Sequence, residues 1–288
     1  MADNFPPIQL GGKYIDYDAL SVKLQDENGD VYGVKHIDNK IRTSSMPYLF
    51  DIAEGHVSGH EAWSNFGYSP SVGTGATDLW SKGGAYVFPG TAMQMSVFSS
   101  NAADTSAGTG AQTVHIHYLD GGWAEKIATV SMNGTALVNT TETDIYRING
   151  FDVVAAGTYK RAVGNISVTG TAGLVTYDHI SANFLVARNS AYTVPIGKAL
   201  YITDVRGAYG HSSNQPEYGR LLFYATVNDN VVTPGLFYGF GESMSDNTTI
   251  PIQIPLPYRM PEKCDIKISC IASAAGIAEV AVRGWLEE

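Results

Sequence analysis

The stretch Thr113-Val114-His115-Ile116-His117-Tyr118 decides the fold class of this chain of 288 residues. Its apolar side chains alternate one by one with a threonine and two histidines. Successive side chains of a β-strand point to opposite faces of the sheet. The period of two therefore predicts a strand with one buried and one exposed face.

Similar alternating or β-branched runs recur along the chain, and Asn-Gly and Gly-Gly pairs separate many of them. Such pairs accept the positive φ angles of tight hairpin turns. Short strands with these turns predict an all-β chain of sandwich or jelly-roll-like domains rather than parallel βα units. The further predicted strands are Ala85–Phe88, Met93–Phe98, Lys126–Met132, Ile145–Ile148, Ile166–Thr169, Ala199–Asp204, Leu221–Val227, Ile250–Ile254, Ile266–Ile271 and Ala278–Gly284.

The chain is long enough for two β-sandwich domains preceded by an arm. Residues 1–45 form the predicted N-terminal arm, which includes a hairpin over Lys23 to Gly33. The first sandwich is expected over residues 46–178, opening with a short helix over Met46 to Gly55. The second sandwich is expected over residues 179–288, because a small-residue stretch precedes this point and suits a domain junction.

The charge of the chain argues against one class of partner. Its net charge is −10 at pH 7, whereas nucleic-acid affinity comes largely from Lys and Arg contacts to phosphates. Residues 1–10 contain no basic segment followed by an apolar stretch, and no run in the sequence is apolar enough to span a membrane. We therefore expect a soluble, unprocessed chain with neither nucleic acid nor membrane as a partner.

The two cysteines, Cys264 and Cys270, lie six residues apart in one predicted strand. At about 3.3 Å per residue they are about 20 Å apart, too far for a disulfide between them. Both point to the same face, so we expect buried free thiols and a cytosolic folding compartment.

His115 and His117 are the candidate metal ligands of the sequence. Residues i and i+2 of a strand share a face, so the two imidazoles are able to bind one ion if a third ligand comes from elsewhere. The alternative, which we favour, is a pair of polar residues on an exposed face. The motifs of serine hydrolases, phosphate-binding loops and dinucleotide-binding folds are missing. We therefore expect no catalytic residue, no metal, no cofactor and no enzymatic activity.

Two groups of aromatic residues lie in loop-like, glycine-containing sequence. They have three interpretations: packing inside the core, contact with a partner protein, or stacking on sugar rings, to which Trp123 would also contribute. The candidate partner-binding residues are Trp63, Phe66, Tyr68, Trp80, Phe237, Tyr238 and Phe240.

Several segments resemble a widespread group of virion structural proteins of tailed bacteriophages. The resemblance runs from about Ser45 to Asp204. It implies a place in the virus particle and a β-sandwich fold, often in trimers, but no catalytic residue. The segments that carry it are Asp51–His60, Gly83–Pro89, Ser99–Gly110, Met132–Thr135, Tyr146–Asn149 and Tyr192–Lys198.

The resemblance and the acidic charge together predict a capsid decoration, or cement, protein. It would be made in the host cytoplasm and lie on the outer surface of the virion. Its expected partners are the major capsid protein or other virion proteins and further copies of itself, with a trimer favoured. A tail, neck or fibre component that contacts the host is the first alternative, and a carbohydrate-binding β-sandwich module is the second.

Overall fold

The computed structural model describes residues 9–10, 13–14, 23–25, 31–33, 48–171, 175–212, 217–228, 238–245 and 249–288. Before residue 49 and over residues 238–245 and 249–255 it describes the backbone alone. The chain separates into two compact units, residues 1–51 and 52–288.

The first unit contains two antiparallel pairs of short strands, and the second of them lies at the predicted hairpin. The first pair is β1 (Gln9–Leu10) with β2 (Lys13–Tyr14), and the second is β3 (Lys23–Gln25) with β4 (Val31–Gly33). The helix α1 (Tyr48–Ala53) lies inside the predicted helical segment but is shorter at both ends. No helix in the described part of the chain is long and apolar enough to cross a membrane.

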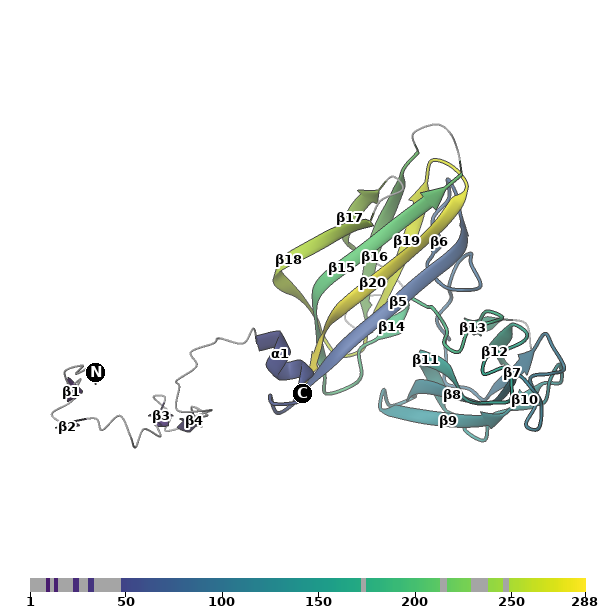
Figure 1. The fold of residues 1–288 in the computed structure, drawn as a ribbon, viewed down its shortest axis with the longest axis horizontal. Coiled ribbons are helices and arrows are strands. Elements are labelled where there is room, and N and C mark those ends of the chain that lie inside the picture. Colours follow the sequence, from purple (N-terminus) through teal and green to yellow (C-terminus); the bar gives the residue numbers. More distant parts are fainter. Residues whose placement is uncertain are drawn as a thin grey trace, which may run out of the picture. The chain divides into compact units, whose positions relative to one another are not determined.

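The second unit confirms the all-β prediction, and its sheets form two groups (Figure 1). The strands are β5 (His60–Val72), β6 (Thr77–Asp78), β7 (Met95–Ser99), β8 (Ala111–Asp120), β9 (Glu125–Ser131), β10 (Val138–Asn139), β11 (Ile145–Ala156), β12 (Ile166–Gly170), β13 (Thr176–Ile180), β14 (Tyr192–Thr193), β15 (Ala199–His211), β16 (Gly219–Val227), β17 (Tyr238–Ser245), β18 (Thr249–Met260), β19 (Cys264–Ala272) and β20 (Gly276–Glu287).

We call the first group the main sandwich. One of its sheets has the order β18-β15-β20-β5, and the other has the order β14-β19-β16-β17 with β6 paired to β19. Alternate side chains of both sheets enter one hydrophobic core, which includes Leu200, Phe223, Ile268 and Val280. Full burial of side chains of this size stabilises a fold by about 1.5–3 kcal/mol each, so this core holds the two sheets together.

The second group, the inserted sandwich, consists of β7 to β13. Its sheets have the orders β10-β7-β12-β13 and β11-β8-β9 and share a second core. Strand β8 carries the stretch that predicted the fold: Val114, Ile116 and Tyr118 enter this core, and the two histidines lie half-buried on the opposite face.

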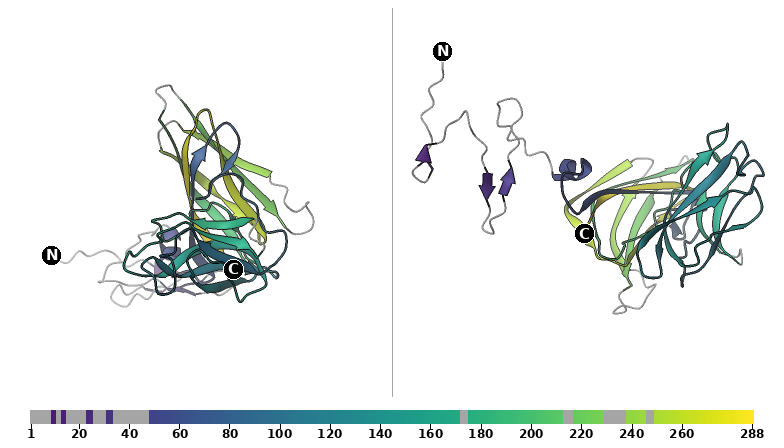
Figure 2. Two further views of the ribbon diagram at one scale, coloured as in Figure 1. Left: turned by 90° about the vertical axis from the view of Figure 1, so that its right-hand side faces the viewer. Right: turned by 90° about the horizontal axis from the view of Figure 1, so that it is seen from below.

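The strand pairing departs from the predicted division at residue 178. Strand β5 pairs with β20 along its whole length, and β6 pairs with β19, so residues 60–78 belong to sheets built mainly of C-terminal strands. Figures 1 and 2 show the blue β5 beside the yellow β20. The main sandwich is thus interrupted by the inserted one. Alternation identifies a strand, but it does not say which strand becomes its partner.

Two smaller predictions have opposite outcomes. The segment Ala85–Phe88 is not a strand; instead the Tyr86 N–H donates to the buried carboxylate of Asp78 at 2.7 Å. The prediction of buried free thiols is confirmed for Cys264 and Cys270, which both lie in β19. Burial raises the pKa of Cys264 to about 12 and that of Cys270 to about 11, so both thiols stay protonated at neutral pH.

The loop that follows β7 is organised around the buried carboxylate of Asp104. Its Oδ1 accepts from the N–H groups of Ala111 (2.8 Å) and Val163 (2.9 Å), and its Oδ2 accepts from the Gly164 N–H (2.7 Å) and the Ser99 hydroxyl (2.6 Å). A Cβ on Gly110 would lie 2.1 Å from Asp104 Oδ1, so only glycine fits there. The carboxylate of Asp104 thus fixes the segment Ser99–Gly110 to the start of β8 and to the loop before β12.

A second buried carboxylate, Asp178 on β13, is poorly compensated. It accepts from the His179 N–H and, at 3.2 Å, from the Asn189 side chain. Burial raises its pKa to about 7, whereas burial and then Lys82 lower the pKa of His179 to about 4. These two residues therefore make the stability of the inserted sandwich depend on pH in opposite directions.

Replacing Asp104 with Ala is expected to lower the free energy of unfolding by about 3 kcal/mol or more, because two buried N–H groups, a half-buried one and the buried Ser99 hydroxyl lose their acceptor. Urea denaturation measures the change. Glu54→Ala, at an exposed position, serves as the control and is expected to change it by less than about 0.5 kcal/mol. Equal effects of the two substitutions would contradict this account of the loop.

Asp178→Asn is expected to gain stability over the wild type as the pH rises from 4 to 7. The raised pKa means that the protonated carboxyl favours folding below about pH 4 and that this contribution is lost as the pH rises through 7. An asparagine does not ionise, so the free energy of unfolding of the variant minus that of the wild type should rise by on the order of 3 kcal/mol between pH 4 and 7. Above pH 7 this difference should level off. His179 affects both proteins alike. Denaturation curves at several pH values test this; a constant difference would refute it.

Candidate functional site

The predicted aromatic residues of β5 divide between its two faces. Phe66 is 37 % exposed and Tyr68, two residues further on, lies on the same outer face and is half-buried. The Tyr68 N–H donates to the Arg188 carbonyl at 3.4 Å, so the chain after β13 runs alongside this edge strand. Phe66 and Tyr68 are therefore placed where a partner is able to reach them.

Arg188 links Tyr68 to an aromatic residue that the sequence did not single out. Its guanidinium lies 3.9 Å from the ring centres of both Tyr68 and Phe184. Burial lowers the pKa of Arg188, and its Nε has no hydrogen-bond partner in the described part of the chain. The two rings compensate for part of this desolvation by cation–π attraction.

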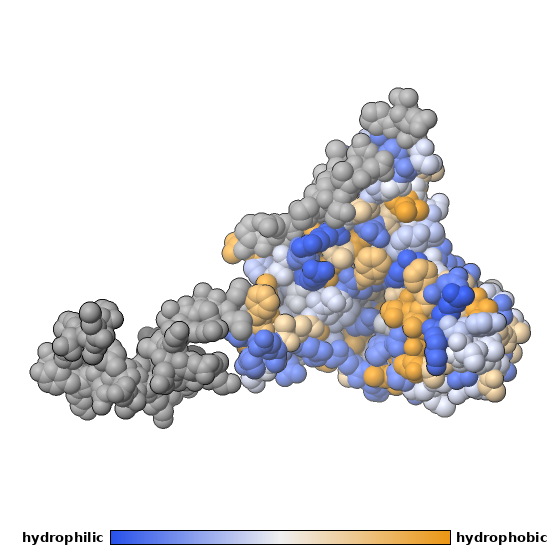
Figure 3. All heavy atoms as spheres, viewed as in Figure 1, coloured by the Kyte–Doolittle hydropathy of each residue, from blue (hydrophilic) through white to orange (hydrophobic). Residues whose placement is uncertain are grey.

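Exposed aliphatic residues continue this surface along the inserted sandwich. Leu185 and Val186 follow Phe184 in the chain and are 41 % and 55 % exposed. The Val153 N–H donates to the Leu185 carbonyl, which puts this segment against β11 and its exposed Val154. Figure 3 shows hydrophobic side chains gathered near β11 on this face. We call the set the outer patch; it consists of Phe66, Tyr68, Val154, Phe184, Leu185 and Val186.

The two tryptophans predicted to bind partners lie elsewhere. Trp80 is 2 % exposed and packs edge-on against Tyr86, and its indole N–H donates to the Gly84 carbonyl. The structure therefore assigns Trp80 to internal packing, which corrects the predicted partner contact. Trp63 packs against Tyr192 and the main core and is half-buried. Phe237 lies outside the described residues, as do the side chains of Tyr238 and Phe240.

A buried ion pair joins the inserted sandwich to the main one. Arg147 of β11 donates to Asp265 of β19 through Nε (3.0 Å to Oδ1) and Nη2 (3.0 Å to Oδ2), and through Nη1 to the Pro89 carbonyl (2.6 Å). The Thr193 hydroxyl also donates to Asp265, and the Asn149 amide exchanges two hydrogen bonds with the Thr193 backbone. The group is fully hydrogen-bonded, so we assign it to structure rather than to chemistry.

Aromatic rings enclose this ion pair. The Arg147 guanidinium lies 4.0 Å from the ring centre of Tyr146 and 5.2 Å from that of Trp123. Burial disfavours its charge, but the hydrogen bonds and the attraction from Asp265 outweigh this and raise the pKa of Arg147. Trp123, a candidate for sugar stacking, is therefore engaged in the junction.

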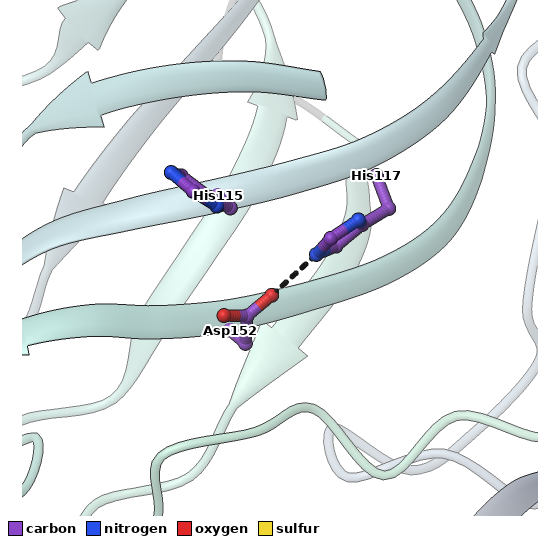
Figure 4. A group of neighbouring side chains, drawn as sticks. All are labelled: His115, His117 and Asp152. Atoms are coloured by element: carbon purple, nitrogen blue, oxygen red, sulfur yellow. Dashed lines mark hydrogen bonds and ion pairs between the residues drawn. The ribbon is translucent and has the colours of Figure 1, made fainter. Parts of the chain in front are cut away.

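His115 and His117 lie on the outer face of β8 together with an acidic residue of the neighbouring strand. Asp152 of β11 is the register partner of His115, and its Oδ1 lies 2.7 Å from His117 Nε2 (Figure 4). The sequence identified the two histidines, but Asp152 could not be found without knowing how β8 and β11 pair. Among the described residues this is the group of three metal-ligating side chains that lie close enough for one ion.

No protein-family model matches the chain, and no curated protein does. Solved structures overlap with it weakly. A chain of infectious bursal disease virus strain Gt matches at 12 % identity and a TM-score of 0.20, covering 83 % of this chain and 77 % of the viral one. A chain of strain Gx matches at 12 % identity and a TM-score of 0.21, covering 79 % of this chain and 76 % of the viral one. A chain of the VP2 subviral particle of that virus matches at 11 % identity and a TM-score of 0.17, covering 80 % of this chain and 77 % of the viral one. TM-scores this low carry no argument about fold or function.

Asp265→Ala is expected to lower the free energy of unfolding by about 3–5 kcal/mol, because it leaves the Arg147 guanidinium buried and unpaired. The double variant Arg147→Met, Asp265→Leu should recover most of this loss. Arg206→Ala breaks the exposed contact to Asp204 at 3.1 Å and is the matched control, expected to cost less than about 1 kcal/mol. Urea denaturation compares the variants, and a double variant as unstable as Asp265→Ala would contradict the assignment.

Proposed function

We propose that this chain is a bacteriophage virion structural protein that decorates and stabilises the outer capsid surface and has no enzymatic activity. The observation that carries an assembly role is the outer patch, because large exposed apolar patches on soluble proteins commonly mark sites of protein–protein interaction. The virus-particle context comes from the sequence resemblance. The acidic charge favours an outer position over contact with packaged DNA.

The strand order of the main sandwich supports this proposal. Counted along the chain, its eight principal strands are β5, β6 and β15 to β20. One sheet then has the order 6-3-8-1. The other has the order 2-7-4-5 when the two-residue strand β14, which also pairs with β19, is left aside. This order is compatible with a jelly roll, an architecture of viral capsid proteins that also occurs in lectins and cupins. Because fold alone does not fix function, the order supports the proposal without deciding it.

The outer patch suits a protein partner better than a sugar. It combines aromatic rings, aliphatic side chains and a stacked arginine, the composition of protein interface centres. Trp80 and Trp123, two of the three tryptophans considered for sugar stacking, are held in internal contacts. We propose the major capsid protein, or another virion protein, as the partner, with self-association into trimers as part of the same assembly.

Leu185→Asp is expected to reduce the amount of this protein on purified particles at least tenfold, because it puts a charge into the outer patch. Leu137→Asp is the matched control: it is the same substitution at a similarly exposed leucine (52 %) that precedes β10 in the other sheet, and it should leave occupancy unchanged. Quantitative mass spectrometry of particles gives the readout. Equal occupancy of both variants would refute a role for the patch.

The same measurement separates a capsid position from a tail position. A copy number on the scale of the capsid lattice indicates decoration of the shell. A copy number on the scale of a tail or neck ring would overturn the decoration proposal in favour of a tail, neck or fibre component.

A further inference from the structure

The outer face of the β11-β8-β9 sheet brings three metal-ligating side chains together. His115 and His117 come from β8 and Asp152 from β11, and one ligand atom of each lies within 4.8 Å of the other two (Figure 4). All three side chains are half-buried; those of His117 and Asp152 are 44 % and 26 % exposed. They are thus accessible to an ion and yet fixed on paired strands.

The backbone around the group is suited to hold it. Between the two histidines Ile116 is fully buried in the core of the inserted sandwich, which fixes this part of β8. Gly150 is the register partner of His117, and a Cβ there would lie 3.3 Å from the His117 ring. A glycine at this position therefore leaves room for the imidazole to lean over β11 toward Asp152.

A hydrogen-bonded His–Asp pair accounts for only two of the three residues. The side chains of His117 and Asp152 satisfy each other at 2.7 Å, but the imidazole of His115 makes no hydrogen bond within the described part of the chain. Its ring lies edge-on to that of His117, with 6.1 Å between the centres. His115 thus offers a free ligand atom beside a pair that already contains an imidazole and a carboxylate.

We propose that His115, His117 and Asp152 bind one divalent transition-metal ion of the zinc class. Imidazole nitrogens and a carboxylate oxygen are zinc ligands at about 2.0–2.2 Å, which puts tetrahedral ligand atoms roughly 3.3 Å apart. The ligand atoms now lie within 4.8 Å of one another, and rotations of the three side chains suffice to bring them to the tetrahedral spacing. A metal ion bound between His117 and Asp152 displaces the proton of their hydrogen bond, which is released to solvent. Magnesium and calcium fit less well, because they need an oxygen-rich shell.

Three protein ligands leave one position of a tetrahedral ion for water. A hollow adjoins the group and gives the ion an entry path; it is lined by His117, Tyr118, Leu119, Glu125, Lys126, Ile127 and Asn149. Bound metal ties β8 to β11 through side chains as well as through the backbone ladder. The inserted sandwich should therefore melt at a higher temperature with zinc than without it.

The test uses the untagged full-length chain, stripped of metal with a chelator and titrated with zinc by calorimetry. One zinc ion per chain is expected. His115→Ala and Asp152→Asn should each weaken binding by at least about tenfold and abolish the zinc-dependent rise in melting temperature. His56→Ala removes an exposed histidine outside the group and should change neither.

Cobalt as a spectroscopic probe makes the outcome independent of stability. The wild type should show the visible absorption of Co²⁺ bound to nitrogen and oxygen ligands, and Asp152→Asn, nearly identical in shape, should alter or lose it. Absence of zinc binding by the wild type overturns the proposal. Equal affinity and equal cobalt spectra in the wild type and in Asp152→Asn overturn it as well, because the ion would then be bound elsewhere.

Discussion

The contact between Arg147 and Asp265 is the constraint on which the arrangement of the second unit depends. It joins a strand of the inserted sandwich to a strand of the main one, in a place from which water is excluded. A buried ion pair gains little net free energy over a hydrophobic contact, but either charge alone is costly. The ion pair therefore favours this arrangement of the two sandwiches, because a shift that separates the two charges without hydrating them is costly.

Buried polar contacts of this kind also account for several segments rich in glycine and small polar residues. Tyr146–Asn149, Tyr192–Lys198 and Gly83–Pro89 all contribute atoms to the junction, and Ser99–Gly110 closes the inserted sandwich around Asp104. Their unusual composition follows from packing: glycines where backbone and carboxylate come close, and polar side chains where buried groups need partners. These segments therefore serve the packing of the second unit.

The sequence predicts those features that depend on residues close together in the chain. It does not predict features that depend on which distant strands pair. Alternation located β8 and the buried cysteines of β19, because side-chain direction repeats locally. The pairing of β5 with β20 has no local signal, and neither has the approach of Asp152 to His117, which depends on a register with a bulge between Ile148 and Gly150. Trp80 was misassigned because glycine-rich sequence suggested an exposed loop, whereas the core reaches into it.

The interruption of the main sandwich has a consequence for the order in which the protein forms on the ribosome. Val72 of β5 pairs with Gly276, so β5 leaves the ribosome long before its partner has been made. Among the described strands, those of the inserted sandwich pair only with one another, and they leave the ribosome consecutively. The inserted sandwich is therefore able to fold first, while the backbone N–H and C=O groups of β5 and β6 have no partner strand yet. Completion of the main sandwich is then a late and slow step of folding, because it requires contacts between residues far apart in the sequence. The unfinished chain is at risk of aggregation until β20 has been synthesised.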